Sequence, residues 1–168
     1  MNQVQEMFKL NDAARLDEAL SRLSGLFDVM AQQPGFLHAE VTRDAADEKT
    51  LLVLHAWERL EDWQAFQGSQ WKLDFMAGRP EGLYNPVPIG MNWTLVAGEE
   101  APSGRFVRRV LSLTRPAAIE GQVFSEAATD GCVAPRWLAL EHREAASSGE
   151  GWFEVLLTRA RGVVGARA

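Results

Sequence analysis

The sequence predicts an α+β protein whose first half follows a split βαβ order and whose second half is shorter and rich in strands. Three observations predict this fold class. Apolar residues recur at helical spacing early in the chain, two strand patterns flank a polar turn at residues 44–49, and the segment GEEAPSG has the composition of a linker. We therefore expect a domain at residues 1–98, a linker at 99–104 and a β-rich half at 105–168.

The first strand and helix are justified by the pattern of apolar residues. Residues Gln3 to Leu10 alternate loosely, as a strand does, and Asn11 or Asp12 can cap the helix that follows. One apolar face then repeats at spacings of four, three, four and three residues, through Leu16, Leu20, Leu23, Phe27 and Met30. The helix is expected to end before Pro34, near Gln33, because proline disfavours helical backbone at the preceding residue.

The remaining elements of this domain follow from apolar runs and the residues that interrupt them. Strands are expected at residues 36–43, 51–57 and 91–97. Helices are expected at residues 59–66 and, with Ser69 as the cap, through Met76, whereas three prolines make residues 78–88 irregular. The resulting order is strand–helix–strand–strand–helix–strand.

The second half partly repeats this order. Residues 105–114 have a strand pattern, residues 116–128 that of a short helix, and residues 131–144 and 152–159 those of two further strands. The order is that of a degenerate repeat, which would pair with the first half as an internal pseudo-dimer. The alternative is an appended β-rich half, with a barrel that closes between two chains.

Composition excludes several classes of protein. Of the 168 residues, 46% are hydrophobic, which suffices for a packed core, and no apolar run reaches the roughly 18 residues that a bilayer requires. The first residues contain no apolar signal region, so we expect a cytoplasmic protein without a membrane partner. Cys132 is the single cysteine, which excludes an internal disulfide and a cysteine-cluster metal site.

Charge is divided unevenly along the chain. Residues 1–100 carry 8 basic and 16 acidic side chains, a net charge of −8, whereas residues 101–168 carry 9 and 7, a net charge of +2. Two separately evolved segments are the simpler explanation of this asymmetry, and the alternative is that the arginine-rich half docks on the acidic half, its own or a partner's. No basic stripe alternates with aromatic residues, which argues against nucleic acid as a partner.

The first half also resembles a known family. Pro34-Gly35-Phe36 precedes a strand, the third strand ends in Trp57-Glu58, and the helical segments contain EDWQAF from Glu61 and SQWK from Ser69. Over residues 1–98 this pattern resembles the antibiotic-biosynthesis-monooxygenase-like domains of the dimeric α/β-barrel group. The resemblance implies a ferredoxin-like sheet that pairs into a barrel, as a homodimer or an internal pseudo-dimer, and a pocket between the sheet and its helices.

Members of this family differ in chemistry. Some are similar to cofactor-free oxygenases of polyketide quinones, and others degrade haem with an Asn, a Trp and an axial His. At the positions of that Trp and His this chain has Phe66 and either Phe75 or Met76, none of which ligates iron as imidazole does, and Asn11 lies too late for the Asn. The resemblance therefore implies no tightly bound cofactor, with haem as a minor alternative.

His55 is the first candidate catalytic residue. It lies in the middle of the third strand and shares a strand face with Trp57, where it can act as a base. The alternative is a core histidine that hydrogen-bonds a neighbour. His38, expected on the same face as Phe36 and Glu40, is predicted to approach His55 across the ladder, although the spacing identifies no metal site.

Aromatic and amide side chains supply the other candidates. A pocket for a planar aromatic ligand is predicted to be lined by Trp57, Trp63, Phe66, Trp71, Tyr84, Trp93 and His38. Asn85 and Asn92 flank or enter the fourth strand, where an amide can hold a substrate oxygen or a dioxygen-derived anion. The alternatives are core and dimer packing for the tryptophans and turn or cap roles for the asparagines.

Together these candidates predict a cofactor-independent monooxygenase that acts on a small aromatic or polycyclic metabolite, with His55 as the base. Two alternatives stay open, a non-catalytic ligand-binding or stress-associated barrel protein and a haem-binding protein with His38 or His55 as ligand. The sequence has no phosphate-binding glycine loop and no nucleophile elbow, so flavin or nicotinamide binding by a Rossmann unit is unsupported.

Overall fold

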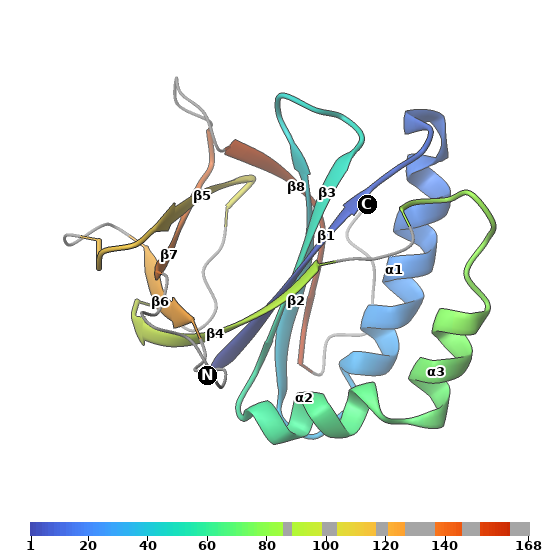
Figure 1. Ribbon diagram of the computed structural model, residues 1–168, viewed down its shortest axis with the longest axis horizontal. Helices are drawn as coiled ribbons and strands as arrows, with labels where there is room; N and C mark the ends of the chain where they lie inside the picture. The colour runs from blue at the N-terminus through green and yellow to red at the C-terminus, as the bar shows by residue number, and fades with distance from the viewer. Residues whose placement is uncertain (86–88, 99–103, 117–120, 127–136, 146–151, 162–168) are drawn as a thin grey trace.

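A computed structural model describes residues 1–85, 89–98, 104–116, 121–126, 137–145 and 152–161. Within these residues eight strands form one closed barrel in the order β1-β3-β2-β8-β5-β7-β6-β4. The helices α1, α2 and α3 lie together on one side of the barrel, against the strands of the first half (Figure 1). None of the described helices is long and apolar enough to cross a membrane.

The first half contains four strands, three helices and a 3-10 turn. Their bounds are β1 Asn2–Lys9, η1 Ala13–Arg15, α1 Leu16–Met30, β2 Phe36–Asp44, β3 Thr50–Trp57, α2 Leu60–Gln67, α3 Gln70–Ala77 and β4 Ile89–Ala97. The predicted order and type of these elements are confirmed. The caps are also those predicted, because the Asp12 side chain accepts a hydrogen bond from the backbone N–H of Ala14 and Ser69 accepts one from that of Lys72.

The second half contributes four strands to the described structure, which are β5 Phe106–Ser112, β6 Gln122–Glu126, β7 Trp137–Arg143 and β8 Trp152–Ala160. The helix predicted at residues 116–128 is wrong where it can be compared, because residues 122–126 form a strand. In this strand, β6, the side chains of Gln122, Val123 and Phe124 are buried, and the backbone is hydrogen-bonded to β4 on one side and to β7 on the other. Pairing with two neighbours therefore overrides the helical pattern. Cys132 and the start of the strand predicted at 131–144 lie outside the described residues.

The barrel closes within a single chain. If the strands of each half are numbered 1 to 4 in chain order, both halves have the spatial order 4-1-3-2. This order is β4-β1-β3-β2 in the first half and β8-β5-β7-β6 in the second. The halves join where β2 pairs with β8 and β4 pairs with β6, both antiparallel. This arrangement supports the internal pseudo-dimer, whereas the origin of the second half as a degenerate repeat stays a prediction.

Alternation along the strands creates two cores. One face of the first four strands packs against the helices, and its buried residues include Phe8, Leu51, Val53 and Trp57. The opposite face points into the barrel, and the apolar side chains there are Leu52, Leu54, Trp93, Val107, Phe124, Leu138, Leu140 and Phe153. The two cores therefore lie on opposite sides of one sheet.

Polar contacts also join the halves. Arg159 and Arg161 of the second half form ion pairs of 2.6 and 2.7 Å with Asp28 and Glu58 of the first. Inside the barrel, Arg109 Nε donates a hydrogen bond of 3.0 Å to the Gln5 side chain. The arginine-rich half thus docks on the acidic half of its own chain, which confirms one of the two predicted arrangements.

Candidate active site between the sheet and the helices

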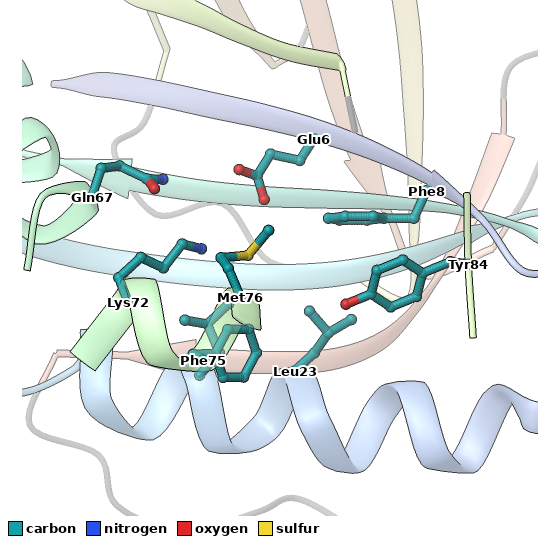
Figure 2. Close-up of a pocket in the computed structure, with 9 residues that line it drawn as sticks. Glu6, Phe8, Leu23, Gln67, Lys72, Phe75, Met76 and Tyr84 are labelled. Carbon is teal, nitrogen blue, oxygen red and sulfur yellow. The ribbon is translucent and has the colours of Figure 1, made fainter. Parts of the chain in front are cut away.

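A pocket lies between the sheet and the helices, as the family resemblance implies. It has a volume of about 80 Å³, roughly the space of several water molecules. Its walls come from β1, α1, the end of α2, α3 and the loop before β4 (Figure 2), and they consist of Glu6, Phe8, Leu23, Leu26, Gln67, Lys72, Phe75, Met76 and Tyr84. A pocket of this size suits one aromatic ring, or one end of a larger ring system.

Strand and helix periodicity place the polar groups of this pocket. Because side chains alternate between the two faces of a strand, Val4, Glu6 and Phe8 of β1 all point to the helix-covered face. Glu6 is therefore a carboxyl group between two apolar side chains. In α3 the positions 72, 75 and 76 lie on one helix face and line the pocket. Figure 2 shows the Glu6 and Lys72 side chains pointing into the same space from β1 and α3.

Burial shifts the pKa values of both Glu6 and Lys72 toward the uncharged forms. It raises the pKa of the Glu6 carboxyl, and the Lys72 ammonium opposes this with a smaller effect. Lys72 is only 4% exposed, and this burial lowers the pKa of its ammonium group, while the negative charge of Glu6 opposes the shift. Within the described part of the chain neither charged head makes a hydrogen bond or a close ion pair. Both are therefore left to interact with a ligand.

Aromatic rings and Arg22 hold α3 over the pocket. The Lys72 ammonium lies 5.9 Å from the centre of the Phe66 ring and 5.7 Å from that of Phe75, within reach of cation–π attraction. The Arg22 guanidinium of α1 stacks 3.9 Å above the Phe75 ring and donates hydrogen bonds to the backbone carbonyls of Phe75 and Gly78. A cation at the carbonyl end of a helix is also favoured by the helix dipole.

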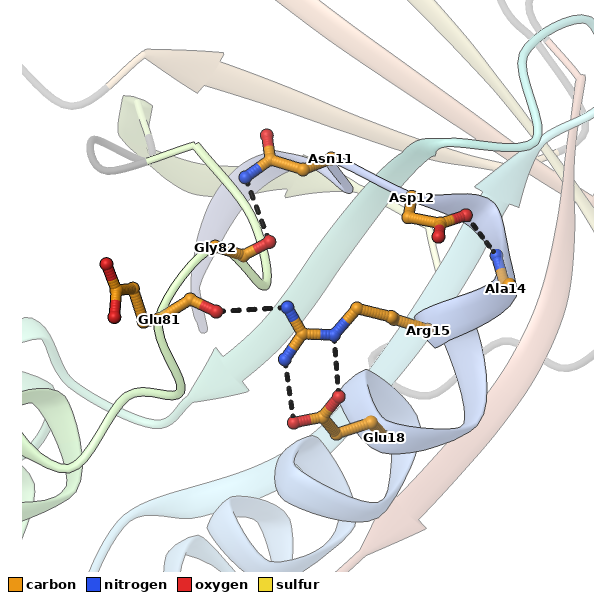
Figure 3. A network of polar contacts seen from close by, with 7 residues as sticks. All are labelled: Asn11, Asp12, Ala14, Arg15, Glu18, Glu81 and Gly82. Atoms are coloured by element: carbon orange, nitrogen blue, oxygen red, sulfur yellow. Dashed lines mark hydrogen bonds and ion pairs between the residues drawn. The ribbon is translucent and has the colours of Figure 1, made fainter.

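The loop that carries Tyr84 is fastened to the start of α1 (Figure 3). Asn11 Nδ2 donates a hydrogen bond of 2.9 Å to the Gly82 carbonyl. Arg15 donates one of 3.0 Å to the Glu81 carbonyl and binds both carboxylate oxygens of Glu18. Asn11 is therefore a loop anchor, and the contacts fix the Tyr84 ring against Phe8 at a centroid distance of 5.0 Å.

A larger hollow at the barrel rim is less suited to chemistry. It measures about 470 Å³ and is lined by Arg43, Asp44, Ala45, Ala46, Glu48, Phe106 and Glu154. Two of its charged groups already pair with each other, because Arg43 lies 2.7 Å from Glu154. Asp44 is occupied as well, since it accepts a hydrogen bond from the backbone N–H of Ala46.

The structure places His55 in the core beside the pocket and not in its wall. The residue is 0% exposed, and the Trp57 indole N–H donates a hydrogen bond of 2.8 Å to His55 Nδ1. Because indole can only donate, the imidazole proton must sit on Nε2. Burial, with smaller effects of Lys72 and His38, lowers the pKa of His55 to about 3. The geometry therefore favours the core-histidine alternative, while the catalytic role stays a prediction.

The predicted approach of His38 to His55 is wrong. The β2–β3 ladder pairs His38 with Ala56 and His55 with Ala39, so the two imidazoles lie on opposite faces of the sheet. An irregularity between Phe36 and His38 also places these two residues on opposite faces, whereas Glu40 remains on the barrel side with His38.

The predicted aromatic wall is only partly assembled. Tyr84 lines the pocket, whereas Trp93 is fully buried on the barrel side and Trp63 packs beside the helix-covered core. Trp57 and Phe66 are buried behind the pocket, and Trp71 is 39% exposed on α3. These three rings stack in a row that reaches the pocket at Phe75.

Of the two predicted asparagines, only Asn85 has a described side chain, and it is not among the described residues of the pocket wall. Asn85 is exposed, and its backbone N–H donates a hydrogen bond of 3.0 Å to the Lys9 carbonyl. Asn92 pairs with Val4 in the β1–β4 ladder, but its side chain lies outside the described residues. Sequence reasoning missed Glu6 and Lys72, although a carboxyl group between Val4 and Phe8 in an alternating strand was a usable signal.

Metal and haem ligands are not gathered here. Among the described residues no group of three His, Cys, Asp or Glu side chains could hold a metal ion. The described pocket wall has no histidine, and His38 and His55 are enclosed on opposite sides of the sheet. The residues present therefore do not fit haem in this pocket.

Comparison with known proteins finds a family match for part of the chain. Residues 5–77 match the family model described as antibiotic biosynthesis monooxygenase. No curated protein sequence matches the chain. One similar solved structure is that of a candidate monooxygenase from Fusobacterium nucleatum, with a TM-score of 0.69 and 13% identity over 97% of this chain and 95% of that one.

Two further structures share the fold. An anthrone oxidase-like protein has a TM-score of 0.66 and 13% identity, over 99% of this chain and 96% of that one. A candidate monooxygenase from Lactobacillus acidophilus has a TM-score of 0.54 and 10% identity, over 85% and 78% of the two chains. At these identities the structures show a shared fold alone. Residues 5–77 therefore form a domain that is similar to the antibiotic biosynthesis monooxygenase family.

Proposed function

We propose that this protein is a monooxygenase that oxidises a small aromatic molecule in the pocket between the sheet and the helices, without a tightly bound cofactor. The observation that carries the proposal is a carboxyl group and an ammonium group, both without direct partners, facing one aromatic-walled space. The family match and the fold shared with an anthrone oxidase-like protein support the reaction class.

Glu6 is the proposed base. A carboxylate whose pKa is raised by burial is a stronger base once ionised than an exposed one, and it accepts the proton of an acidic aromatic O–H or C–H. The Lys72 ammonium, placed across the pocket, stabilises the oxygen on which the substrate's negative charge collects. Phe8, Phe75 and Tyr84 supply the apolar surface that contacts the ring.

The oxygen step needs no external reductant. The substrate anion gives one electron to dioxygen, and the two radicals join through a new carbon–oxygen bond to form a peroxide. The peroxide then loses water as its oxygen–oxygen bond breaks, so that a CH₂ group and O₂ become C=O and H₂O. All four electrons that reduce dioxygen to the oxygen of the product and of water come from the substrate.

The proposal is tested with anthrone and 1-naphthol, which carry an acidic C–H and an acidic O–H. We expect Glu6→Gln to lower kcat for oxygen uptake by about 10²–10⁴-fold, because glutamine has a similar shape but cannot accept the proton. Glu61→Gln, at an exposed position of α2, is the matched control and should leave the rate unchanged. If Glu6→Gln retains the rate, Glu6 is not the base.

The same experiment separates a binding protein from an enzyme. Ligand binding is followed by quenching of tryptophan fluorescence, and turnover by an oxygen electrode. Saturable binding of both probes without any oxygen uptake would contradict the proposed oxygenase and favour the non-catalytic ligand-binding alternative.

A further inference from the structure

Four rings form a continuous row behind the pocket, which we call the aromatic row (Trp57, Phe66, Trp71 and Phe75). Their successive centroid distances are 5.7, 6.2 and 5.3 Å, and their interplanar angles are 28°, 31° and 16°. The first and last pairs are stacked and the middle pair is tilted, and all three centroid distances lie within the range of aromatic interactions. Core packing alone does not require a row of rings that runs from a buried residue to the pocket.

The two ends of the aromatic row differ in environment. Phe75 forms part of the pocket wall, and its neighbour Trp71 is 39% exposed to solvent. Trp57, at the far end, is fully buried and donates its indole N–H to His55 Nδ1 at 2.8 Å. The row therefore connects the pocket with the surface and with a proton acceptor in the core.

Neighbouring cations determine which rings can be oxidised. The Lys72 ammonium lies over Phe66 and Phe75, and Arg22 lies 3.9 Å above Phe75. A positive charge over a ring opposes the loss of an electron from it. Indole loses an electron more easily than benzene, so an electron vacancy in the row rests on Trp71 or Trp57 and crosses Phe66 between them.

We propose that the aromatic row carries oxidising equivalents away from the pocket, so that radicals escaping the oxygen reaction do not damage its walls. The inference rests on the proposed function, because that reaction supplies the oxidant, a peroxyl or hydroperoxyl radical. The radical takes one electron from Trp71 through Phe75 and one proton from water, which leaves hydroxide; a peroxyl radical thereby becomes a hydroperoxide and a hydroperoxyl radical becomes hydrogen peroxide. Met76 and Tyr84, the oxidisable side chains of the pocket wall, are thereby spared.

The oxidised Trp71 is restored in one of two ways. A reductant in solution, such as ascorbate, returns the electron directly at the exposed indole edge. Otherwise Trp57 gives the electron through Phe66, and its N–H proton moves to His55 Nδ1, which leaves a neutral indole radical and an imidazolium. The electron that reduces Trp57 again comes from the same solution reductant, through Trp71 and Phe66, and the proton then returns to the indole because a buried imidazolium is unfavourable.

The test uses an oxidant that does not depend on turnover. Tris(bipyridine)ruthenium(III) is generated by a light flash in solution, indole radicals are followed by transient absorption, and oxidised residues are mapped by peptide mass spectrometry. In the natural protein we expect oxidation of Trp57 although it is fully buried, with slower formation of its neutral radical in D₂O.

Trp71→Phe is the decisive variant, because it keeps a stacked ring but removes the indole. We expect it to lower Trp57 oxidation at least fivefold, whereas Trp63→Phe, outside the aromatic row, should leave it unchanged. Equal Trp57 oxidation in both variants, or none in the natural protein, would overturn the inference. A second experiment follows oxygen consumption with anthrone, where Trp71→Phe should increase oxidation of Met76 and Tyr84. Absence of anthrone turnover would count against the proposed function, while the flash experiment would still decide whether the row conducts.

Discussion

The burial of His55 predicts how the free energy of unfolding depends on pH. Replacing His55 by glutamine keeps an oxygen that can accept the Trp57 indole proton but removes the imidazole that titrates. The folded state holds the pKa of His55 at about 3, against an ordinary value of 6.5, because burial disfavours the imidazolium. Acid should therefore destabilise the natural protein through His55, and this effect should be absent from the variant.

The sign and size follow from proton linkage. Between pH 6.5 and 3 the unfolded chain protonates His55 while the folded chain does not, so stability is fully present above pH 6.5 and falls as the pH is lowered. Each tenfold difference in proton affinity corresponds to about 1.4 kcal/mol, which gives a loss of ~3 kcal/mol by pH 4 and at most ~5 kcal/mol below pH 3. At neutral pH the substitution itself should cost about 1–2 kcal/mol, through altered packing of a buried polar group.

The measurement is urea unfolding at pH 7, 5.5 and 4. The natural protein should be more stable at pH 7, and His55→Gln should be the more stable of the two at pH 4. Carboxyl groups and His38 titrate in both proteins and cancel in the comparison. Parallel losses of stability in the two proteins would refute the reasoning, and loss of oxygen uptake in His55→Gln at unchanged stability would restore His55 as a catalytic base.

Two other substitutions examine the pocket and its scaffold. Lys72→Met removes the charge that favours the Glu6 carboxylate, so the acidic limb of the kcat/KM profile with anthrone should move to higher pH; an unshifted limb would mean that Glu6 does not control it. Gly35→Ala should lower the free energy of unfolding by about 2–4 kcal/mol and so lower the midpoint of urea unfolding. The reason is that Gly35 has φ of 75° and an added Cβ would collide with the Asp62 side chain. An unchanged midpoint would contradict this packing.

The first half was predictable because its signals are local. Periodic apolar residues determined α1, and Asp12 and Ser69 acted as the caps that their side chains suggest. The strand β6 was not predictable in this way, since its conformation depends on hydrogen bonds to β4 and β7 from distant parts of the chain. Whether the barrel would close within one chain or between two was likewise undetermined, because both arrangements bury the same sheet face.

The candidate site shows the same division. The location of the pocket followed from the family resemblance, and Tyr84, one of the predicted wall residues, lines it. The opposite placement of His38 and His55 was not visible, since one irregularity in β2 reverses the alternation on which the prediction relied. Glu6 was overlooked because a single carboxyl group in a strand usually faces solvent, although its place between Val4 and Phe8 in the alternation indicated the helix-covered face.

The internal pseudo-dimer explains why this pocket lies on the first half of the chain. Both halves share the strand order 4-1-3-2, but the pocket needs walls from α1 and α3, and no described residue of the second half forms a helix. That half instead covers the barrel side of the first sheet and is joined to it by side chains that cross the interior, such as His142 at 3.1 Å from Glu40. Because the sheet is thereby packed on both faces, Glu6 is held on a rigid strand opposite Lys72. The second half therefore serves the proposed chemistry by fixing the wall from which the base projects.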